Sequence, residues 1–438
     1  MKLRRDYFRL TILVVMAMLA TMALAACGDN TATSAPAATT AAATTAASAT
    51  TAAAATTAAS ATTAASATTA AGATTAAGAT TAASAGGGNL SGTIKIGALE
   101  SMTGNASVYG VSIKNALDLA VSEINDQKFL GNATINLTVL DDKGDKQEGI
   151  SVMNKLVDQE KVSAILGPTL STVAFSADPI AQKAGIPVLG TSNTANGITD
   201  MGNFVFRNSL PESGVIPGTI AAVKEKLNPK KAALLYDSSD EFSKSGFEVF
   251  KAELGKNNIQ VSDTESYGKG DTDFRTQLNK MKLSNPDIYV VSGLIAQAIP
   301  IVQQAREIGI TQPIVGGNGF NSPNIITQAK DAAEGIIVGS AWFLGSPNPK
   351  SQAFVTAFKK KYNTDPDQFA AQAYDGMWLI ATAIKNAGSS DPKAIRDSLA
   401  KIRDFDGVLG KFSFDDHRDP QHQPVVLVVK GGKFDLFK

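Results

Sequence analysis

Residues 165–172 read ILGPTLST, and residues 187–194 read PVLGTSNT. Each segment begins with a short apolar run, which is typical of a buried parallel strand, and then passes through glycine into hydroxyl side chains where we expect a helix to begin. The first turn of a helix carries free backbone N–H groups and the positive end of the helix dipole. Each junction therefore suits a carboxylate or carbonyl group of a ligand, although Ser171 and Ser192 could equally serve only as helix N-caps.

The two junctions occupy consecutive strand–helix units of the chain. Because the carboxyl ends of neighbouring parallel strands converge on one crevice, a pair of junctions favours a binding site over two unrelated caps. We therefore predict that Ser171 and Ser192 lie at a site for a small ligand.

Strand-like and helix-like segments alternate through the roughly 350 residues after residue 88. A first series runs from Thr93–Leu99 to the two junctions, and a second begins after Phe204–Arg207. The expected strands of the second series are Ala232–Tyr236, Ile259–Thr264, Ile288–Ser292, Pro313–Gly316 and Gly335–Ala341. Helical stretches at 351–361 and 368–387 precede strands at 411–414 and 425–429. This alternation is typical of parallel sheets covered by helices, so we expect two α/β lobes with a ligand cleft between them.

The composition argues against several classes of function. The chain has 40 basic and 40 acidic residues, so its charge gives no reason to expect a nucleic-acid partner. Cys27 is the only cysteine, and His417 and His422 are the only histidines, which argues against a cysteine metal cluster or a Ser-His-Asp triad. The glycine-rich run 316–319 lacks the Lys-Ser/Thr pair of a phosphate-binding loop. We therefore expect no catalytic residues, no metal and no cofactor.

The first 26 residues have the features of an export signal. Lys2, Arg4 and Arg5 form a basic start, residues 10–23 form an apolar core too short to span a membrane, and Leu24-Ala25-Ala26-Cys27 resembles a bacterial lipobox. We predict that residues 1–26 are a lipoprotein signal peptide and that lipidated Cys27 holds the mature protein on the outer face of the cell membrane. The alternative is an ordinary signal peptide with a cysteine at this position by chance.

Residues 27–88 are predicted to join the lipidated cysteine to a folded domain. Residues 30–88 contain no charged and no aromatic side chain, and 44–85 repeat the six-residue unit TTAASA or its glycine variant. A six-residue period builds no apolar stripe, and paired threonines weaken the helix that alanine favours. With no core to form, this Ala/Thr-rich tether is expected to stay disordered.

The chain from Gly92 to the C-terminus resembles the extracytoplasmic solute-binding proteins of branched-chain amino acid ABC importers, the leucine/isoleucine/valine-binding type. The resemblance rests on an ordered set of motifs, which are Ile96-Gly97, Thr103-Gly104, Tyr109-Gly110, Asp141-Asp142, Gly167-Pro168, Ser171-Thr172, Ile186-Pro187, Tyr236-Asp237 with Phe242, Asp271-Thr272-Asp273-Phe274, Pro286-Asp287, Ala333-Glu334-Gly335 and Ala373-Tyr374-Asp375. It implies an α/β fold of two doubly wound parallel-sheet lobes joined by three hinge crossings, the type I periplasmic-binding-protein fold. We place the crossings near Arg207–Ser209, Ser340–Phe343 and Phe412–Asp415. Lobe 1 then comprises residues 89–208 and 342–413, and lobe 2 comprises residues 209–341 and 414–438.

The resemblance also implies a set of ligand-binding residues. The ligand carboxylate is expected at the two junctions, held by Ser171, Thr172, Ser192 and Thr194. Aromatic and apolar walls are expected from Tyr109, Phe242, Leu294, Trp342 and Phe369, with Phe242 in place of the commoner tyrosine. The alternative for each aromatic residue is ordinary core packing.

One position departs from the pattern of this family. Amino-acid binders of the family usually have an acidic residue where this chain has Asn318. A buried ammonium group without a carboxylate partner is costly, so Asn318 raises the prospect of a ligand without a cation, such as a carboxylate, an amide or an aromatic acid. Glu100 could supply the missing charge, but a place on the rim or in a loop is the favoured interpretation.

The expected function is that of a lipid-anchored protein that binds a small solute, a branched-chain amino acid or a related acid or amide, and delivers it to a membrane permease. The permease and the ATPase would be separate chains. We expect a monomer, which is usual for the family that this chain resembles. The alternatives are a ligand sensor with the same fold and, third, an exported enzyme.

Overall fold

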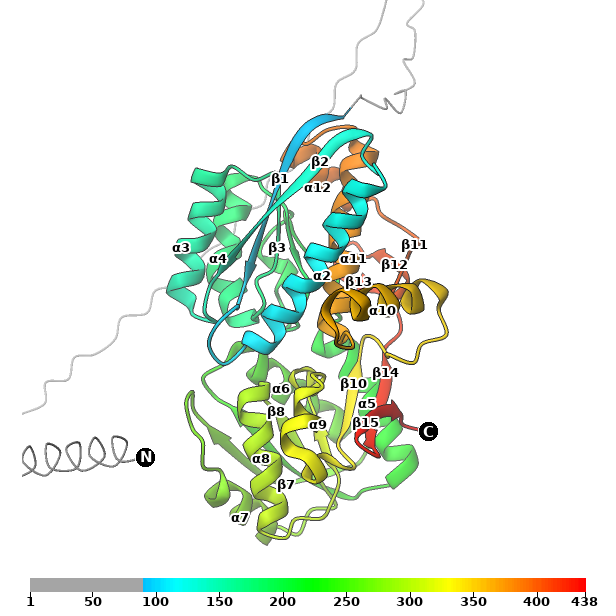
Figure 1. Cartoon of the computed structure of the whole chain (residues 1–438). Coiled ribbons are helices and arrows are strands. Elements are labelled where there is room, and N and C mark those ends of the chain that lie inside the picture. Colours follow the sequence, from blue (N-terminus) through cyan, green and yellow to red (C-terminus); the bar gives the residue numbers. More distant parts are fainter. Residues whose placement is uncertain (1–89) are drawn as a thin grey trace, which may run out of the picture. The chain divides into compact units, whose positions relative to one another are not determined.

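The structure is a computed structural model that describes residues 90–438. The predicted signal peptide, the lipidation site at Cys27 and the predicted tether lie outside the described residues. Two α/β lobes are built around separate sheets (Figure 1), as the alternating pattern predicted. None of the helices in the described range is long and apolar enough to cross a membrane.

The first lobe is built on a five-stranded sheet of order β2-β1-β3-β4-β5, in which every pairing is parallel. Helices α2 and α11 cover one face, and α3 and α4 cover the other (Figure 1). Its elements are β1 (Ser91–Glu100), α2 (Ser107–Asp126), β2 (Asn132–Asp141), α3 (Lys146–Asn154), η1 (Lys155–Glu160), β3 (Ala164–Leu166), α4 (Ser171–Ala184), β4 (Val188–Gly190), η2 (Thr199–Met201), β5 (Val205–Arg207), α10 (Pro349–Tyr362), α11 (Gln368–Ala387) and α12 (Pro392–Leu399).

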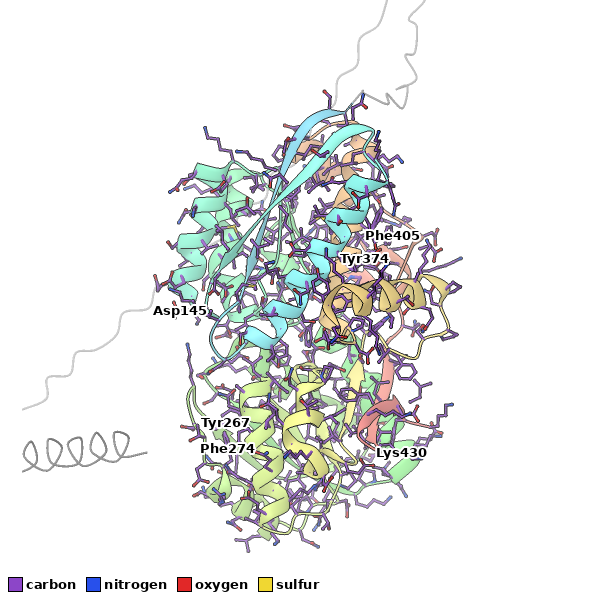
Figure 2. All side chains as sticks on the ribbon, viewed as in Figure 1. Asp145, Tyr267, Phe274, Tyr374, Phe405 and Lys430 are labelled. Atoms are coloured by element: carbon purple, nitrogen blue, oxygen red, sulfur yellow. The ribbon has the colours of Figure 1, made fainter. Side chains whose placement is uncertain are left out.

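The second lobe is built on a seven-stranded sheet of order β15-β14-β10-β9-β8-β6-β7. Its elements are α5 (Glu212–Leu227), β6 (Lys231–Asp237), α6 (Glu241–Lys256), β7 (Gln260–Tyr267), α7 (Arg275–Leu283), β8 (Ile288–Ser292), α8 (Ile295–Glu307), β9 (Ile314–Gly316), η3 (Asn318–Phe320), α9 (Asn324–Ala329), η4 (Lys330–Ala333), β10 (Ile337–Ser340), β14 (Val425–Lys430) and β15 (Lys433–Leu436). Strands β6 to β10 pair in parallel, whereas β14 and β15 add an antiparallel edge that the purely parallel expectation did not include. In its core, Tyr267 and Phe274 (labelled in Figure 2) pack edge to face with ring centroids 5.1 Å apart.

The chain passes between the two sheets three times. It leaves the first sheet after β5 and the second sheet after β10, close to the expected crossings at Arg207–Ser209 and Ser340–Phe343. A small antiparallel sheet of β11 (Phe405–Gly407), β12 (Gly410–Phe414) and β13 (Pro420–Gln421) then precedes β14. Because β13 still pairs with β12, and Asp419 binds Arg207 at the end of β5, the last passage lies between β13 and β14. It therefore follows the expected crossing at Phe412–Asp415 by several residues.

The two strand–hydroxyl junctions differ in structure. Helix α4 begins at Ser171, as expected, and ends at Gly185, whose φ of 71° terminates it in a left-handed cap. After β4, in contrast, the chain forms a loop and only the short 3-10 turn η2. The expected helix at the second junction was therefore wrong. The N-cap interpretation was also wrong for both serines, because the N-cap of α4 is Leu170 and Ser192 lies in a loop.

Candidate functional site

A small cavity of about 20 Å³ lies between the two lobes at the first junction. Its lining comes from the ends of strands and the starts of helices in both lobes, and consists of Tyr109, Thr169, Leu170, Ser171, Ser192, Phe242, Leu294, Asn318, Gly319 and Phe369. Among residues 90–438, this lining includes no Asp, Glu, Lys or Arg side chain. A cavity of this size holds about one water molecule, so a larger solute enters only when the lobes separate.

The start of α4 presents hydrogen-bond donors to this cavity. Ser171 is the first residue of the 14-residue helix, and within the described residues its backbone N–H donates to no protein acceptor. Its Oγ accepts hydrogen bonds from the N–H groups of Thr194 and Ala195, both at 3.1 Å. These two bonds use the lone pairs of the hydroxyl, so its proton remains available to a ligand oxygen. Together with the helix dipole, these donors favour a carboxylate.

A chain of hydrogen bonds joins the second junction to the interior of the first lobe. Ser192 Oγ donates to the carbonyl oxygen of Thr169 at 2.7 Å, and Thr169 Oγ1 donates to Glu100 Oε2 at 2.5 Å. Thr169 was not among the predicted residues, although it lies between two residues of the quoted motif. Its signal was its place directly after a strand end, which is where ligand contacts gather in parallel sheets.

Glu100 occupies a different environment from the one expected. It is the last residue of β1, it is fully buried, and it does not line the cavity. Burial raises the pKa of its carboxyl group to about 8, against the hydrogen bond from Thr169, which lowers it. The group is therefore largely neutral at pH 7 and cannot supply a charge for an ammonium ion. The rim-or-loop interpretation was also wrong, because the side chain is fully buried and accepts a hydrogen bond from Thr169 Oγ1.

Aromatic and apolar side chains from both lobes close the cavity. The rings of Tyr109 and Phe369 pack at a centroid distance of 4.6 Å. The hydroxyl of Tyr109 donates to the carbonyl oxygen of Gly319 and accepts from the N–H of Ile295, both at 2.7 Å, so it bonds the first lobe to the second. Burial raises the pKa of Tyr109, so the hydroxyl keeps its proton. Phe242 and Leu294 complete the wall from the second lobe.

The chain is similar to known proteins in sequence and in structure. The family model described as "Periplasmic binding protein" matches residues 93–433. The chain belongs to this family. The branched-chain amino acid transporter substrate-binding protein LivJ from Streptococcus pneumoniae str. Canada MDR_19A, solved in complex with isoleucine, is 35% identical, with a TM-score of 0.75 and coverage of 78% of this chain and 98% of LivJ.

Two further relatives of this periplasmic binding protein are similar over nearly their whole length. The leucine-binding protein LivK from Thermotoga maritima MSB8 is 27% identical, with a TM-score of 0.74 and coverage of 78% of this chain and 97% of LivK. The Leu/Ile/Val-binding protein homolog 2 of Brucella abortus (strain 2308) is 27% identical over 363 residues, which cover 80% of this chain and 95% of that protein.

The cavity of this periplasmic binding protein gathers most of the predicted site residues. Seven of them line it, namely Tyr109, Ser171, Ser192, Phe242, Leu294, Asn318 and Phe369. Their contact with a ligand remains a prediction. Thr172, Thr194 and Trp342 do not line this cavity, and each has a partner of its own.

The three remaining predicted residues bind protein groups around the site. Thr172 Oγ1 donates to Asp240 Oδ1 at 2.6 Å and accepts from the N–H of Glu241, which bridges α4 to the start of α6. Trp342 donates its indole N–H to Ser351 Oγ and lines a separate cavity of about 400 Å³. Thr194 Oγ1 donates to Glu212 Oε1 at 2.7 Å.

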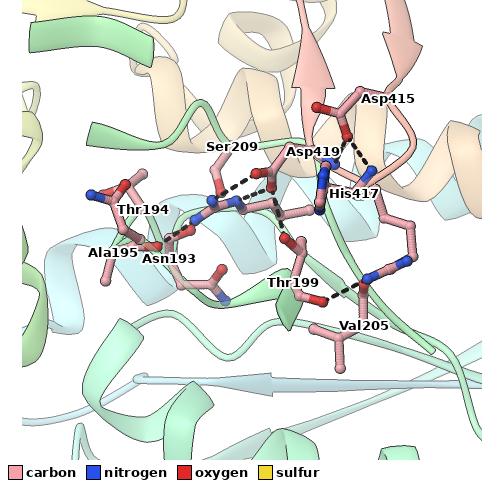
Figure 3. A network of polar contacts seen from close by, with 12 residues as sticks. Asn193, Thr194, Ala195, Thr199, Val205, Ser209, Asp415, His417 and Asp419 are labelled. Atoms are coloured by element: carbon pink, nitrogen blue, oxygen red, sulfur yellow. Dashed lines mark hydrogen bonds and ion pairs between the residues drawn. The ribbon is translucent and has the colours of Figure 1, made fainter. Parts of the chain in front are cut away.

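A buried ion pair supports the loop that carries Ser192 (Figure 3). Arg207, with a side chain only 1% exposed, donates from Nε and Nη2 to the two carboxylate oxygens of Asp419, and from Nη1 to the carbonyl oxygen of Ala195 at 2.6 Å. Ser209 Oγ donates to the carbonyl oxygen of Asn193 at 2.8 Å. Sequence reasoning missed the Arg207–Asp419 pair, because its two residues are 212 positions apart.

Glu212 is a second buried carboxyl group near the same loop. It is the first residue of α5, and burial raises its pKa to about 7 despite the hydrogen bond from Thr194 and the charge of Arg207, which both lower it. It lies outside the cavity lining. Its only sequence signal was an acidic residue in the first turn of a helix, which is a common and unspecific feature.

Proposed function

We propose that this periplasmic binding protein is the solute-binding component of an ABC importer and that it encloses a small carboxylate-type solute between its lobes. The observation that carries the proposal is the start of α4, where Ser171, with its hydroxyl proton and backbone N–H free of protein acceptors in the described residues, lines a cavity walled by Tyr109, Phe242, Leu294 and Phe369. Such a site binds a carboxylate at one end and an apolar body at the other. Three relatives are named for leucine, isoleucine or valine, which supports a branched-chain amino acid or a related acid or amide.

Binding and release would follow from movement of the lobes about their three connections. Ligand entry requires separation of the contacts that Tyr109 and Thr172 make with the second lobe. A ligand that bonds to both lobes favours the closed arrangement by its differential affinity for that state. The closed form is then the one presented to permease and ATPase subunits on separate chains.

A titration panel with the full-length protein tests the ligand class. The panel contains leucine, isoleucine, valine, their deaminated acids and their amides, measured by thermal shift and calorimetry. A ligand of the folded state stabilises it by about 2.7 kcal/mol at a hundredfold excess over Kd. We expect at least one member to bind, and Ser171→Ala to weaken it about tenfold or more, because the ligand loses a donor. Silence from the whole panel would contradict the proposal.

We further propose that the mature protein is held at the outer face of the cell membrane through lipidated Cys27. The basic start, the short apolar core and the Leu24-Ala25-Ala26-Cys27 sequence support this. In expressing cells, Cys27→Ser should move the protein from the membrane fraction to the soluble extracytoplasmic fraction and abolish incorporation of a labelled fatty acid. Membrane retention of this variant would contradict the anchor.

A further inference from the structure

We infer that the cavity selects a carboxylic acid without an ammonium group, whose second polar group is a carbonyl or hydroxyl oxygen placed next to Asn318. The inference rests on the proposed function and narrows its ligand class. It depends on which edge of the Asn318 amide is free, because oxygen accepts hydrogen bonds and nitrogen donates them. The surrounding hydrogen bonds decide this edge.

The orientation of Gln368 is fixed by a backbone group. Its Oε1 accepts from the N–H of Ala341 at 2.9 Å, and a backbone N–H can only donate. Ser340 Oγ lies 2.8 Å from the same oxygen and 2.7 Å from the carbonyl oxygen of Trp342. Because its single proton can go to either acceptor, this contact does not determine the orientation of the Gln368 amide. The Ala341 contact alone places the oxygen of Gln368 toward the connection after β10. The Nε2 of Gln368 is therefore the edge that faces Asn318.

The orientation of Asn318 follows from that of its neighbours. Gln368 Nε2 donates to Asn318 Oδ1 at 2.5 Å. Asn321 Nδ2 donates to the carbonyl oxygen of Gly339 at 2.8 Å and lies 3.3 Å from the backbone carbonyl oxygen of Asn318 and 3.4 Å from its Oδ1, so its second proton has an acceptor whichever way the Asn318 amide is turned. Reversal of the Asn318 amide would set its NH₂ against the NH₂ of Gln368. The oxygen edge is therefore occupied.

The nitrogen edge of Asn318 is left for a ligand. Within the described residues, its Nδ2 donates to no protein acceptor, while Asn318 lines the cavity and Gln368 does not. Asn318 thus offers an N–H donor, and Ser171 offers its O–H and N–H at the start of α4. A ligand with one oxygen acceptor near Asn318 and another near Ser171 can therefore accept hydrogen bonds at both of its ends.

An ammonium group finds no such match. It would face the N–H of Asn318, and among the described residues the cavity lining contains no carboxylate to neutralise it. An unpaired buried cation is strongly disfavoured, and a desolvated mismatch between two donors adds to that cost. Replacement of the amino group by a carbonyl oxygen changes this polar group from donor to acceptor at nearly constant size. A comparison of leucine with 4-methyl-2-oxopentanoate therefore isolates the effect of this donor-to-acceptor change on affinity.

The orientation also depends on lobe closure. Gln368 begins α11 of the first lobe, whereas Asn318 begins η3 of the second. The Asn318 amide is therefore oriented only when the lobes meet, at the moment that the ligand is enclosed. The protein therefore distinguishes ligands that donate a hydrogen bond to Asn318 from ligands that accept one only in its closed state.

The test compares leucine with 4-methyl-2-oxopentanoate by calorimetry on the purified full-length protein. We expect the oxo acid to bind at least about tenfold more tightly. In Gln368→Glu, the carboxylate still accepts from Ala341 but cannot donate to Asn318, whose amide reverses and presents oxygen to the cavity. The affinity ratio should then shift toward leucine by about tenfold or more. Gln368→Met, which has no charge, should reduce the preference without reversing it.

Thermal unfolding and near-UV circular dichroism establish that both variants fold. If leucine binds the wild type better than the oxo acid, the inference is overturned while the proposed function stands. If neither ligand nor any other member of the panel binds, the carboxylate assignment fails and the inference fails with it. If both bind as expected but Gln368→Glu leaves the ratio unchanged, the role of Gln368 in orienting Asn318 is overturned.

Discussion

At the scale of single residues, several buried carboxyl groups of the described chain have raised pKa values. Burial raises the pKa of Glu100 to about 8, of Glu212 and Asp375 to about 7, and of Asp367 to about 6. Between the ordinary value of such a group and its raised value, the folded state holds a proton that the unfolded chain has released. The free energy of unfolding therefore falls as pH rises through that window.

Glu100→Gln tests this dependence at a carboxyl group whose pKa burial raises to about 8. From pH 4.5 to about 8, the ionisation of Glu100 opposes folding. The wild type should lose stability across this range, and the glutamine variant should lose less, by an amount on the order of a few kcal/mol at pH 9 relative to pH 5. Urea denaturation at a series of pH values measures the difference. Parallel curves for the two proteins would show that Glu100 does not titrate in this range.

The Arg207–Asp419 ion pair is a second interaction between single residues that contributes to the free energy of unfolding. Asp419→Asn removes the charge that faces a guanidinium with a side chain only 1% exposed. Because Asp419 is itself 21% exposed, we expect a loss of about 2–3 kcal/mol in the free energy of unfolding, below the full cost of breaking a buried pair. Asp416→Asn, an exposed change on the same turn, is the matched control and should stay within about 0.5 kcal/mol of wild type. Equal effects of the two changes would contradict the prediction.

At the scale of elements, the alternating pattern predicted most strands and helices near their observed positions. Ile288–Ser292 and 368–387 were predicted at the bounds that the structure shows. The missing helix after β4 could not be predicted, because its place is taken by a loop bonded to Arg207 and Ser209. A local sequence pattern contains no information about a tertiary partner that holds a loop in place.

The contact between the starts of α4 and α6 allows a test of lobe closure. Thr172→Val removes a hydroxyl that donates to Asp240 and accepts from Glu241 across the lobes. Asp240 keeps its cap on Ser243, so the free energy of unfolding should change little. We expect ligand affinity to fall about 5- to 30-fold, as for the loss of hydrogen bonds made only on closure. Calorimetry measures it, with Ser176→Ala on the same helix as a control that should leave affinity unchanged.

At the scale of the whole described chain, sequence reasoning predicted two lobes and most of the cavity lining. The strand ends and aromatic residues carried that signal, because parallel strands bring their carboxyl ends together. The orientation of the Asn318 amide could not be predicted in this way. That orientation depends on Gln368 and Ala341, which lie near Asn318 only after both lobes and their connection have folded.

Tyr109→Phe tests how strongly the lobes are held together. The change removes two hydrogen bonds that join the first lobe to Gly319 and Ile295 of the second. In small-angle scattering without ligand, the variant should have a larger radius of gyration than wild type. Its ligand affinity should fall by about tenfold, because a smaller fraction of molecules is closed. An unchanged scattering profile together with unchanged affinity would contradict a closing role for this hydroxyl.

The three passages between the sheets also determine the order in which the protein is able to fold. Helix α2 packs against α11, so the first lobe cannot be completed until residues far along the chain have arrived. The segment from α5 to β10 contains most of the second lobe and forms its contacts over much shorter separations. Its early folding brings the two halves of the first lobe close together, which reduces the entropy cost of closing that long loop. We therefore expect the second lobe to fold before the first lobe is completed.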